Sequence, residues 1–249
     1  MAKIYPLSEG QFTVGHDKQF IRFNEEKEEL TARSIGSLHV DVQPFVVITD
    51  RDILLLDTGL GFANEDNLLQ IHQNLFDKGI APETVTKVLL SHLHKDHAGG
   101  IVFKDEDGII KPTFCNAVYY IYRKEAEYAL KTGLPSYVPE EIEALLRSNQ
   151  VKWLDAEEGY IDNYIHYSHT GAHCPAHIVF LIDDGFDKVF YGGDEAPQLK
   201  QMLIRYIAKY DFDGKKAMQL REQYAERGKR DGWQFLFYHD YKTPVSKIN

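Results

Sequence analysis

Four side chains that can bind a metal ion fall within six consecutive positions of this chain. They are His92, His94, Asp96 and His97. The apolar run 85–90 just before them has the residues of a strand, so His92 and His94 are expected to point to the same side of an extended segment. Imidazole nitrogens combined with a carboxylate oxygen suit zinc and neighbouring transition metals. The spacing therefore favours a metal site over a loop of unrelated surface histidines.

The elements that must hold these residues are short strands with helices between them. β-branched and aromatic runs predict strands at 44–49, 53–56, 85–90, 117–122, 151–154, 164–169, 177–183, 188–191 and 234–238. Amphipathic spacing predicts a helix ending at Gly79, helices at 123–132, 140–147 and 199–210, and a last one from Gly214 to about Arg227. Two sheets with helices outside them fit this order. Because no repeat or linker interrupts the chain, we expect residues 1–249 to form a single domain.

The composition is that of a folded protein and disfavours a membrane or a nucleic acid as partner. Of the 249 residues, 43% are hydrophobic, and no run approaches the roughly 18 apolar residues of a membrane span. The formal net charge of −10 disfavours nucleic acid, because neutralising phosphates needs clustered Lys and Arg. The N-terminus has no apolar run typical of a signal peptide, and the two cysteines are far apart, so we expect a cytoplasmic protein. A homodimer is left open.

Five stretches resemble, in order and spacing, the motifs of the metallo-β-lactamase superfamily. They are the strand-ending DTG element at 54–59, the HxHxDH signature at 92–97, the turn at 170–177, the GD element at 191–194 and a late histidine element at 237–240. The resemblance spans about residues 40 to 240. The helical stretch between Asp194 and His239 is most similar to the N-acyl homoserine lactonase-like branch.

This resemblance implies an α/β (α+β) fold, a four-layer αββα sandwich of the metallo-β-lactamase type with a dinuclear metal site at one edge of the two sheets. It assigns His92, His94 and His173 to one metal ion, Asp96, His97 and His239 to the other, and Asp194 to both. The implied cofactors are two divalent cations, in the first place Zn²⁺, with Mn²⁺ or Fe²⁺ as alternatives.

Two further residues are expected to support these ligands rather than bind metal. Asp57, in the DTG element, is expected to hold a ligand histidine, because metal-bound imidazoles usually donate their other N–H to a carboxylate or carbonyl. His177 follows the matched turn and is expected outside the metal coordination, in structure or in substrate contact. Cys174 lies beside a ligand, but its side chain should point away from that of His173, so we interpret it as packing.

The implied site predicts metal-dependent hydrolysis. Two neighbouring cations can share a water molecule, lower its pKa toward neutrality and polarise a carbonyl or phosphoryl oxygen. The bridging hydroxide would attack the carbonyl of a lactone or related ester. Asp96 is the candidate catalytic residue that accepts a proton and returns it to the leaving group. The sequence has no G-x-S-x-G element, which argues against a serine α/β-hydrolase.

Departures from the family pattern narrow the class of small-molecule substrate that the implied site would act on. Asp194 stands where antibiotic-hydrolysing members with a mixed site carry Cys, and His94 stands where di-iron redox members carry Glu. The segment 195–198 lacks the Gly- and Cys-containing stretch of glyoxalase II-like thioesterases. Pro197 stands where some lactonases carry a Tyr that contacts the carbonyl. These departures do not fix the substrate. The alternatives that remain are a thioester hydrolase, a phosphodiester or organophosphate hydrolase and a non-catalytic metal-binding protein.

Overall fold

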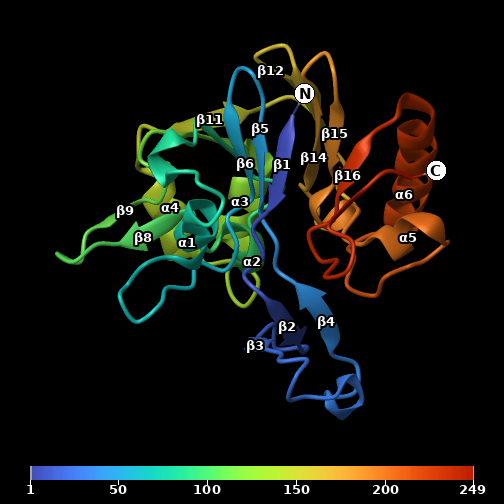
Figure 1. Cartoon of the computed structure of the whole chain (residues 1–249), viewed down its shortest axis with the longest axis horizontal. Coiled ribbons are helices and arrows are strands. Elements are labelled where there is room, and N and C mark those ends of the chain that lie inside the picture. Colours follow the sequence, from blue (N-terminus) through green and yellow to red (C-terminus); the bar gives the residue numbers. More distant parts are fainter. Residues whose placement is uncertain (1, 249) are drawn as a thin grey trace.

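Two six-stranded sheets lie face to face in the computed structural model, which describes residues 2–248 (Figure 1). The first sheet has the strand order β1-β5-β6-β7-β10-β11. Its strands are β1 (Lys3–Pro6), β5 (Phe45–Ile48), β6 (Ile53–Leu56), β7 (Lys87–Leu89), β10 (Val118–Tyr122) and β11 (Val151–Leu154). The predicted strands 44–49 and 53–56 form a hairpin, since β5 and β6 pair antiparallel. β6, β7, β10 and β11 then run parallel to one another.

The second sheet has the strand order β12-β13-β14-β15-β16-β17. Its strands are β12 (Glu158–Ile161), β13 (Ile165–His169), β14 (Ile178–Asp183), β15 (Lys188–Tyr191), β16 (Gln234–Leu236) and β17 (Val245–Ser246). Only the β15–β16 pair is parallel, and it joins the last predicted strand to the sheet across the helical segment between them.

Both faces of each sheet are apolar, and successive residues of a strand enter different cores. In β6, Leu54 and Leu56 pack between the two sheets, whereas Leu55 packs on the outer side. In β14, Phe180 faces the inter-sheet core and Val179 the opposite outer core. This period-two pattern is what a pleated strand requires when both of its faces are covered.

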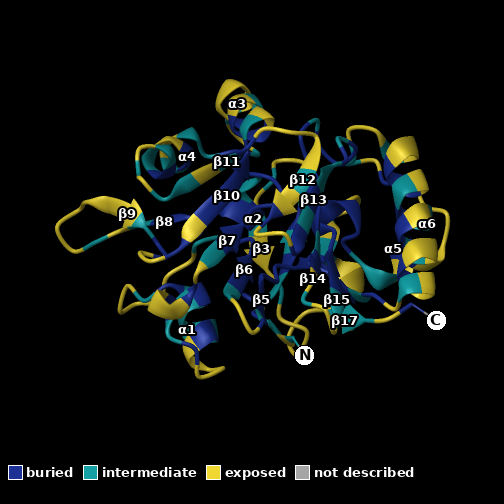
Figure 2. Cartoon of the chain, turned by 90° about the horizontal axis from the view of Figure 1, so that it is seen from above, coloured by how far each residue is buried: buried dark blue, intermediate teal, exposed yellow. Residues whose placement is uncertain are grey.

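Helices cover the outer face of each sheet, as the burial colours show (Figure 2). α1 (Gln70–Phe76), α3 (Arg123–Thr132) and α4 (Pro139–Leu146) contribute apolar side chains to the core outside the first sheet. α5 (Leu199–Leu203) and α6 (Gly214–Asp231) do so outside the second sheet. The result is the expected αββα order of layers. No helix within residues 2–248 is both long and apolar enough to cross a bilayer.

Smaller elements complete the fold. A three-stranded sheet with the order β3-β2-β4 consists of β2 (Gln11–Val14), β3 (Phe20–Arg22) and β4 (Leu38–Asp41) and projects beside α2 (Lys95–Ala98) (Figure 1). β8 (Val102–Lys104) and β9 (Ile110–Pro112) form a hairpin. Three short 3₁₀ turns are η1 (Leu30–Ala32), η2 (Pro82–Thr84) and η3 (Gly193–Glu195). The sequence patterns did not reveal the three-stranded sheet.

One predicted helix is much shorter than its apolar pattern suggested. The pattern 199–210 becomes a helix only to Leu203, because Ile204 adopts an extended conformation. The buried guanidinium of Arg221 binds the backbone carbonyl oxygen of Tyr206 at 2.9 Å, which fixes the chain outside a helix. The prediction of a helix to residue 210 was therefore wrong. The apolar residues after Leu203 belong to an irregular segment that includes Tyr206 and Tyr210.

Candidate metal centre

Strand directions bring the singled-out residues to one edge of the sandwich. β13 and β15 both pair antiparallel with β14, and β15 pairs parallel with β16. The strands β13, β15 and β16 therefore run in the same direction and end at the same edge. They are followed by His173, Asp194 and His239, respectively. In the other sheet, β6 and β7 run parallel and are followed by Asp57 and by the segment 91–97.

The loops that follow β6 and β7 fit tightly against each other. The amide of Thr58 donates to the carbonyl oxygen of His97 at 2.7 Å, and the amide of Gly99 donates to that of Gly59 at 2.9 Å. A Cβ atom at Gly100 would lie 2.3 Å from the carbonyl oxygen of Thr58, so only glycine fits there. Gly99 and Gly100 thus allow the end of the histidine segment to pack closely against the loop after β6.

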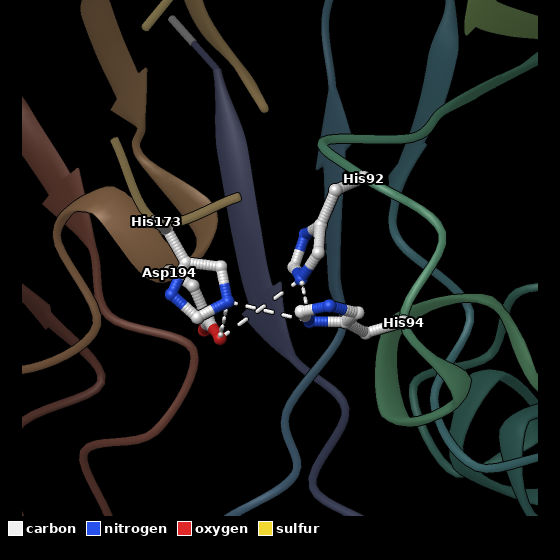
Figure 3. Close-up of side chains that lie close together, drawn as sticks. All are labelled: His92, His94, His173 and Asp194. Atoms are coloured by element: carbon white, nitrogen blue, oxygen red, sulfur yellow. Dashed lines mark hydrogen bonds and ion pairs between the residues drawn. The ribbon is translucent and has the colours of Figure 1, made fainter. Parts of the chain in front are cut away.

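A first cluster contains His92, His94, His173 and Asp194 (Figure 3). The Nε2 atom of His92 lies 2.9 Å from Nδ1 of His94, which lies 3.3 Å from Nε2 of His173. The Nε2 atom of His173 lies 3.1 Å from Oδ2 of Asp194. One ligand atom from each of the four residues lies within 4.8 Å of the others, a spacing that could hold one metal ion.

A second cluster contains Asp96, His97 and His239, again beside Asp194. One ligand atom from each of the first three lies within 4.8 Å of the others. Oδ2 of Asp96 is 3.7 Å from Nε2 of His97 and 3.6 Å from Nε2 of His239. The same two nitrogens lie 3.2 and 2.9 Å from Oδ1 of Asp194. The two oxygens of Asp194 thus face different clusters.

The atoms at this centre are those that a divalent cation would satisfy. Nε2 of His97 and Oδ1 of Asp194 are buried and have no hydrogen-bond partner among the described residues. Leaving such groups unpaired in a protein interior costs about 1–3 kcal/mol each, more for charged groups. Nitrogen and carboxylate oxygen donors suit zinc and related ions. The residues present therefore fit two metal ions.

The opposite nitrogen of His97 is held by Asp57. Its Nδ1 atom lies 2.7 Å from Oδ2 of Asp57, which also receives hydrogen bonds from the hydroxyls of Ser91 and Tyr191. The Ser91 amide donates to the other oxygen of Asp57 at 2.7 Å. Asp57 is completely buried, and its carboxylate contacts a candidate ligand on the side away from the second cluster.

Two other imidazoles are held by groups that the sequence did not single out. Nδ1 of His173 lies 3.1 Å from Oδ1 of Asp211, whose other oxygen lies 3.5 Å from the buried Arg221. Nδ1 of His239 lies 2.6 Å from the backbone carbonyl oxygen of Asp41 in β4. Asp211 directly follows the predicted helix 199–210, and no local pattern marks it as a partner of His173.

The segment between His92 and His94 is anchored by a buried carboxylate, also missed. Glu125 in α3 accepts a hydrogen bond from the amide of Leu93 at 2.9 Å. The thiol of Cys174 donates to the other oxygen of Glu125 at 3.5 Å. Cys174 therefore points away from the centre, as expected. Burial raises the pKa of Glu125 above its usual range.

His177 lies behind His92 rather than in the substrate space. Its ring is fully buried, with its centroid 4.9 Å from that of the His92 ring. Its Nδ1 atom lies 3.2 Å from the Thr170 hydroxyl, while its Nε2 atom has no hydrogen-bond partner among the described residues. Of the two roles weighed for His177, this position fits the structural one.

Charge is unevenly divided among these side chains. Burial, followed by the neighbouring imidazoles, holds the pKa of His92 and of His94 well below the usual value. Burial alone would also lower the pKa of His97, but the carboxylates of Asp194 and Asp96 raise it well above that value. Burial would raise the pKa of Asp194, yet His239, His173 and His97 hold it well below its ordinary range. The centre is an ionised carboxylate among imidazoles, which a metal cation can stabilise in place of protons.

A cavity of about 180 Å³ lies over the two clusters. Its floor is formed by His94, Asp96, His173, Asp194 and His239. The three-stranded sheet supplies an apolar wall with Val14, Phe20, Leu38 and Val40, and the segment after α5 supplies Tyr206 and Tyr210. Neither element was predicted from the sequence to face the site. Side chains from distant parts of the chain thus enclose a space beside both clusters.

The family model of the metallo-beta-lactamase superfamily matches residues 40–232. The chain belongs to this superfamily. The match confirms the resemblance in the motifs and the expectation of a hydrolase of this class. No curated protein matches the chain significantly.

Solved structures of the superfamily have the same fold. A probable metal-dependent hydrolase from Staphylococcus aureus is 20% identical, with a TM-score of 0.78 over 99% of this chain and 92% of that one. AidC, a dizinc quorum-quenching lactonase, is 19% identical, with a TM-score of 0.73 over 99% and 90% of the chains. An N-acyl homoserine lactone hydrolase is 21% identical, with a TM-score of 0.65 over 96% and 94%. At these identities the likeness establishes the fold alone.

Proposed function

We propose that this chain is a dinuclear metal-dependent hydrolase that opens a lactone or cleaves a related ester. The observation that carries the proposal is the position of Asp194. Its Oδ2 atom lies 3.1 Å from Nε2 of His173, and its Oδ1 atom lies 2.9 Å from Nε2 of His239. A carboxylate with one oxygen toward each histidine cluster can bind two cations at once.

The two clusters would each hold one cation. His92, His94 and His173 would bind the first, Asp96, His97 and His239 the second, and Asp194 both. We propose Zn²⁺ as the metal, with Mn²⁺ and Fe²⁺ as alternatives that accept the same donors. When bound, the pair would lower the pKa of a water molecule and polarise the oxygen of the substrate.

The side chains around the cavity would carry out the proton transfers. Asp96 lines the cavity, where its carboxylate would accept a proton from the attacking water and return it to the leaving oxygen. The hydroxyl of Tyr210 accepts a hydrogen bond from Nε2 of Gln201 at 3.0 Å, which leaves its own proton to donate to a substrate oxygen. Burial raises the pKa of Tyr210, so its phenol stays protonated.

Two observations favour a lactone or ester. AidC and the N-acyl homoserine lactone hydrolase were solved with N-hexanoyl-L-homoserine as bound product. The cavity here also has an apolar wall, formed by side chains such as Phe20 and Val40, that suits an acyl chain. Its volume of about 180 Å³ is below the roughly 300–1,000 Å³ of many ligand sites, which favours a small substrate.

A phosphodiester is the second candidate, because Lys18 and Lys95 also line the cavity. Their ammonium groups could offset the negative charge of a phosphate. Thioesters share the carbonyl chemistry of esters but have no separate observation in their favour.

Metal content and a substrate panel test the proposal. We expect protein loaded with Zn²⁺ to hold two equivalents by elemental analysis and to hydrolyse a lactone faster than an activated phosphodiester or a thioester. Asp194→Ala should retain at most one equivalent and lose about 100-fold or more in kcat, because both clusters lose an oxygen donor. The matched control is Asp66→Ala, which removes an exposed carboxylate.

Crystals of the loaded protein should show two anomalous peaks, one beside each cluster. A single peak, or an Asp194→Ala variant with unchanged metal content and rate, would contradict the dinuclear proposal. Equally slow hydrolysis of every substrate class would instead favour a metal-binding protein without catalysis.

A further inference from the structure

Two lysines line the cavity over the candidate metal centre and have no acidic partner. They are Lys18, in the turn between β2 and β3, and Lys95, the first residue of α2. Both are half-buried. Within residues 2–248, no carboxylate oxygen lies within 4 Å of either ammonium group.

An ammonium group without an acidic partner is common in this fold, since only four lysines within residues 2–248 lie within 4 Å of a carboxylate oxygen. Lys87 pairs with Asp52 and, at 3.1 Å, with Asp162, and Lys124 pairs with Glu157. Lys18 and Lys95 differ from those four in that they line the cavity over the candidate metal centre. The two carboxylates in the cavity, Asp96 and Asp194, face the histidine clusters instead.

The surrounding structure holds the two lysines at the cavity wall. The backbone amide of Lys95 donates to the carbonyl oxygen of Ser136 at 2.9 Å, and its Nζ atom lies 5.8 Å from the centroid of the Phe20 ring. Phe20 begins β3, two residues after Lys18. The ammonium group of Lys95 therefore lies where the three-stranded sheet meets α2, and Lys18 lines the cavity from the turn that leads into β3 of that sheet.

An anion is the chemical group that such a wall would attract. Two like charges in a partly enclosed space raise the local potential, and a bound anion lowers their mutual repulsion. The neighbouring apolar side chains, Phe20 and Leu38, would contact an aliphatic or aromatic segment between that anion and the reacting bond.

We propose that Lys18 and Lys95 bind an anionic group, a carboxylate or a phosphate, that the substrate carries outside the bond to be cleaved. The inference rests on the proposed hydrolase function and narrows its substrate to acidic esters or lactones. Lys18 and Lys95 are then specificity-determining residues rather than catalytic ones.

Matched esters test this specificity. Phenyl hexanoate and the monophenyl ester of adipic acid have acyl chains of equal length, but only the second ends in a carboxylate. We expect the zinc-loaded protein to hydrolyse the adipate ester with a kcat/KM at least 10-fold higher, and this preference to fall in 0.5 M salt. A third ester whose chain ends in a phosphonate distinguishes a phosphate site from a carboxylate site.

Lysine variants assign the preference to these residues. Lys18→Gln and Lys95→Gln should each reduce the preference at least 3-fold, and the double variant should abolish it, because kcat/KM for the adipate ester falls by a larger factor than kcat/KM for phenyl hexanoate. Lys18→Arg and Lys95→Arg should keep the preference because they keep the charge. The matched control, Lys229→Gln, removes an exposed lysine of α6 outside the cavity and should change nothing.

A binding measurement separates this inference from the proposed function. Monomethyl adipate should give saturation-transfer NMR signals with metal-free protein, and these should disappear in the Lys18→Gln/Lys95→Gln variant, whereas neutral methyl hexanoate should show no such dependence. If no ester is hydrolysed but this binding persists, only the proposed function fails. Equal kcat/KM for the two esters, or a preference unchanged in the double variant, would overturn the inference.

Discussion

The Nδ1 atom of His97 lies 2.7 Å from Oδ2 of Asp57, a carboxylate with no exposed surface. This pair joins the loop after β6 to the histidine segment after β7. Since Asp57 accepts the proton of Nδ1, a metal ion that displaces the other proton of the ring would bind the Nε2 atom, which faces the second cluster. The contact thus determines which nitrogen of His97 can bind a metal.

We therefore predict that Asp57→Asn weakens the second metal site. The amide cannot orient His97 as a carboxylate does, and loss of such a partner typically costs 10–100-fold in metal affinity. Asn tolerates the left-handed backbone of residue 57 (φ 55°), so the change adds no strain of its own. Stepwise zinc titration with a competing chelator measures both affinities. The exposed Asp50→Asn is the control, and equal affinities in the two variants would contradict the role of Asp57.

Arg221 should be essential for stability rather than for chemistry. Its guanidinium is 1% exposed and neutralises Asp211, which in turn contacts His173. Arg221→Met removes the buried positive charge and leaves the buried Asp211 with His173 alone, a loss of about 3–5 kcal/mol in the free energy of unfolding. Urea denaturation of the variant and of the original chain measures this difference in the free energy of unfolding.

Another arginine of the same helix, α6, provides the control. Arg230→Met removes an exposed arginine that pairs only with its neighbour Asp231, and it should cost less than about 1 kcal/mol. Similar losses in the two variants would show that the Arg221 contacts are dispensable.

Tyr210→Phe should lower the rate of hydrolysis without weakening substrate binding. The variant removes one hydrogen-bond donor from the cavity, and loss of a donor to a developing oxyanion costs about 100–1,000-fold in kcat. KM should change little, because the contact strengthens only in the transition state. Tyr206→Phe, at a cavity position that is 40% exposed, should change kcat less than about 3-fold. If both variants behave alike, Tyr210 has no special part in the reaction.

Glu9 makes stability depend on pH in an unusual direction. Burial raises its pKa from 4.5 to about 8, so the folded chain holds a proton that the unfolded chain releases. The free energy of unfolding should therefore fall as the pH rises from about 4.5 through about 8, by a few kcal/mol in total at ~1.4 kcal/mol per pKa unit.

Glu9→Gln should remove this dependence. Its amide oxygen can still accept the hydrogen bond of 2.7 Å from the amide of Leu60, and the side chain has no charge to desolvate. Melting temperatures of the variant and of the original chain should be similar at pH 5 and diverge by pH 8.5, with the variant more stable. The exposed Glu65→Gln is the control, and a difference that does not change with pH would contradict the prediction.

The amino-acid sequence by itself determined the layers of the fold and the candidate ligands. The consecutive apolar residues Leu54, Leu55 and Leu56 predict a strand, and the structure places them alternately in the cores on its two faces, because the pleat has a period of two. The segment 92–97 is compact enough for its residue types to indicate a metal site without any knowledge of distant contacts. The remaining candidates, such as Asp194, followed from the order of the family motifs.

Only the tertiary structure decided which groups support those ligands and which side chains line the cavity. Asp211 and His173 are 38 positions apart. The guanidinium that binds the carbonyl oxygen of Tyr206, beyond the end of the shortened helix α5, comes from Arg221 in α6. Lys18 and Lys95 reach one cavity from separate elements. Local periodicity reports how a segment contacts its immediate neighbours, whereas these contacts depend on how the loops at the sheet edges pack, which no short-range pattern encodes.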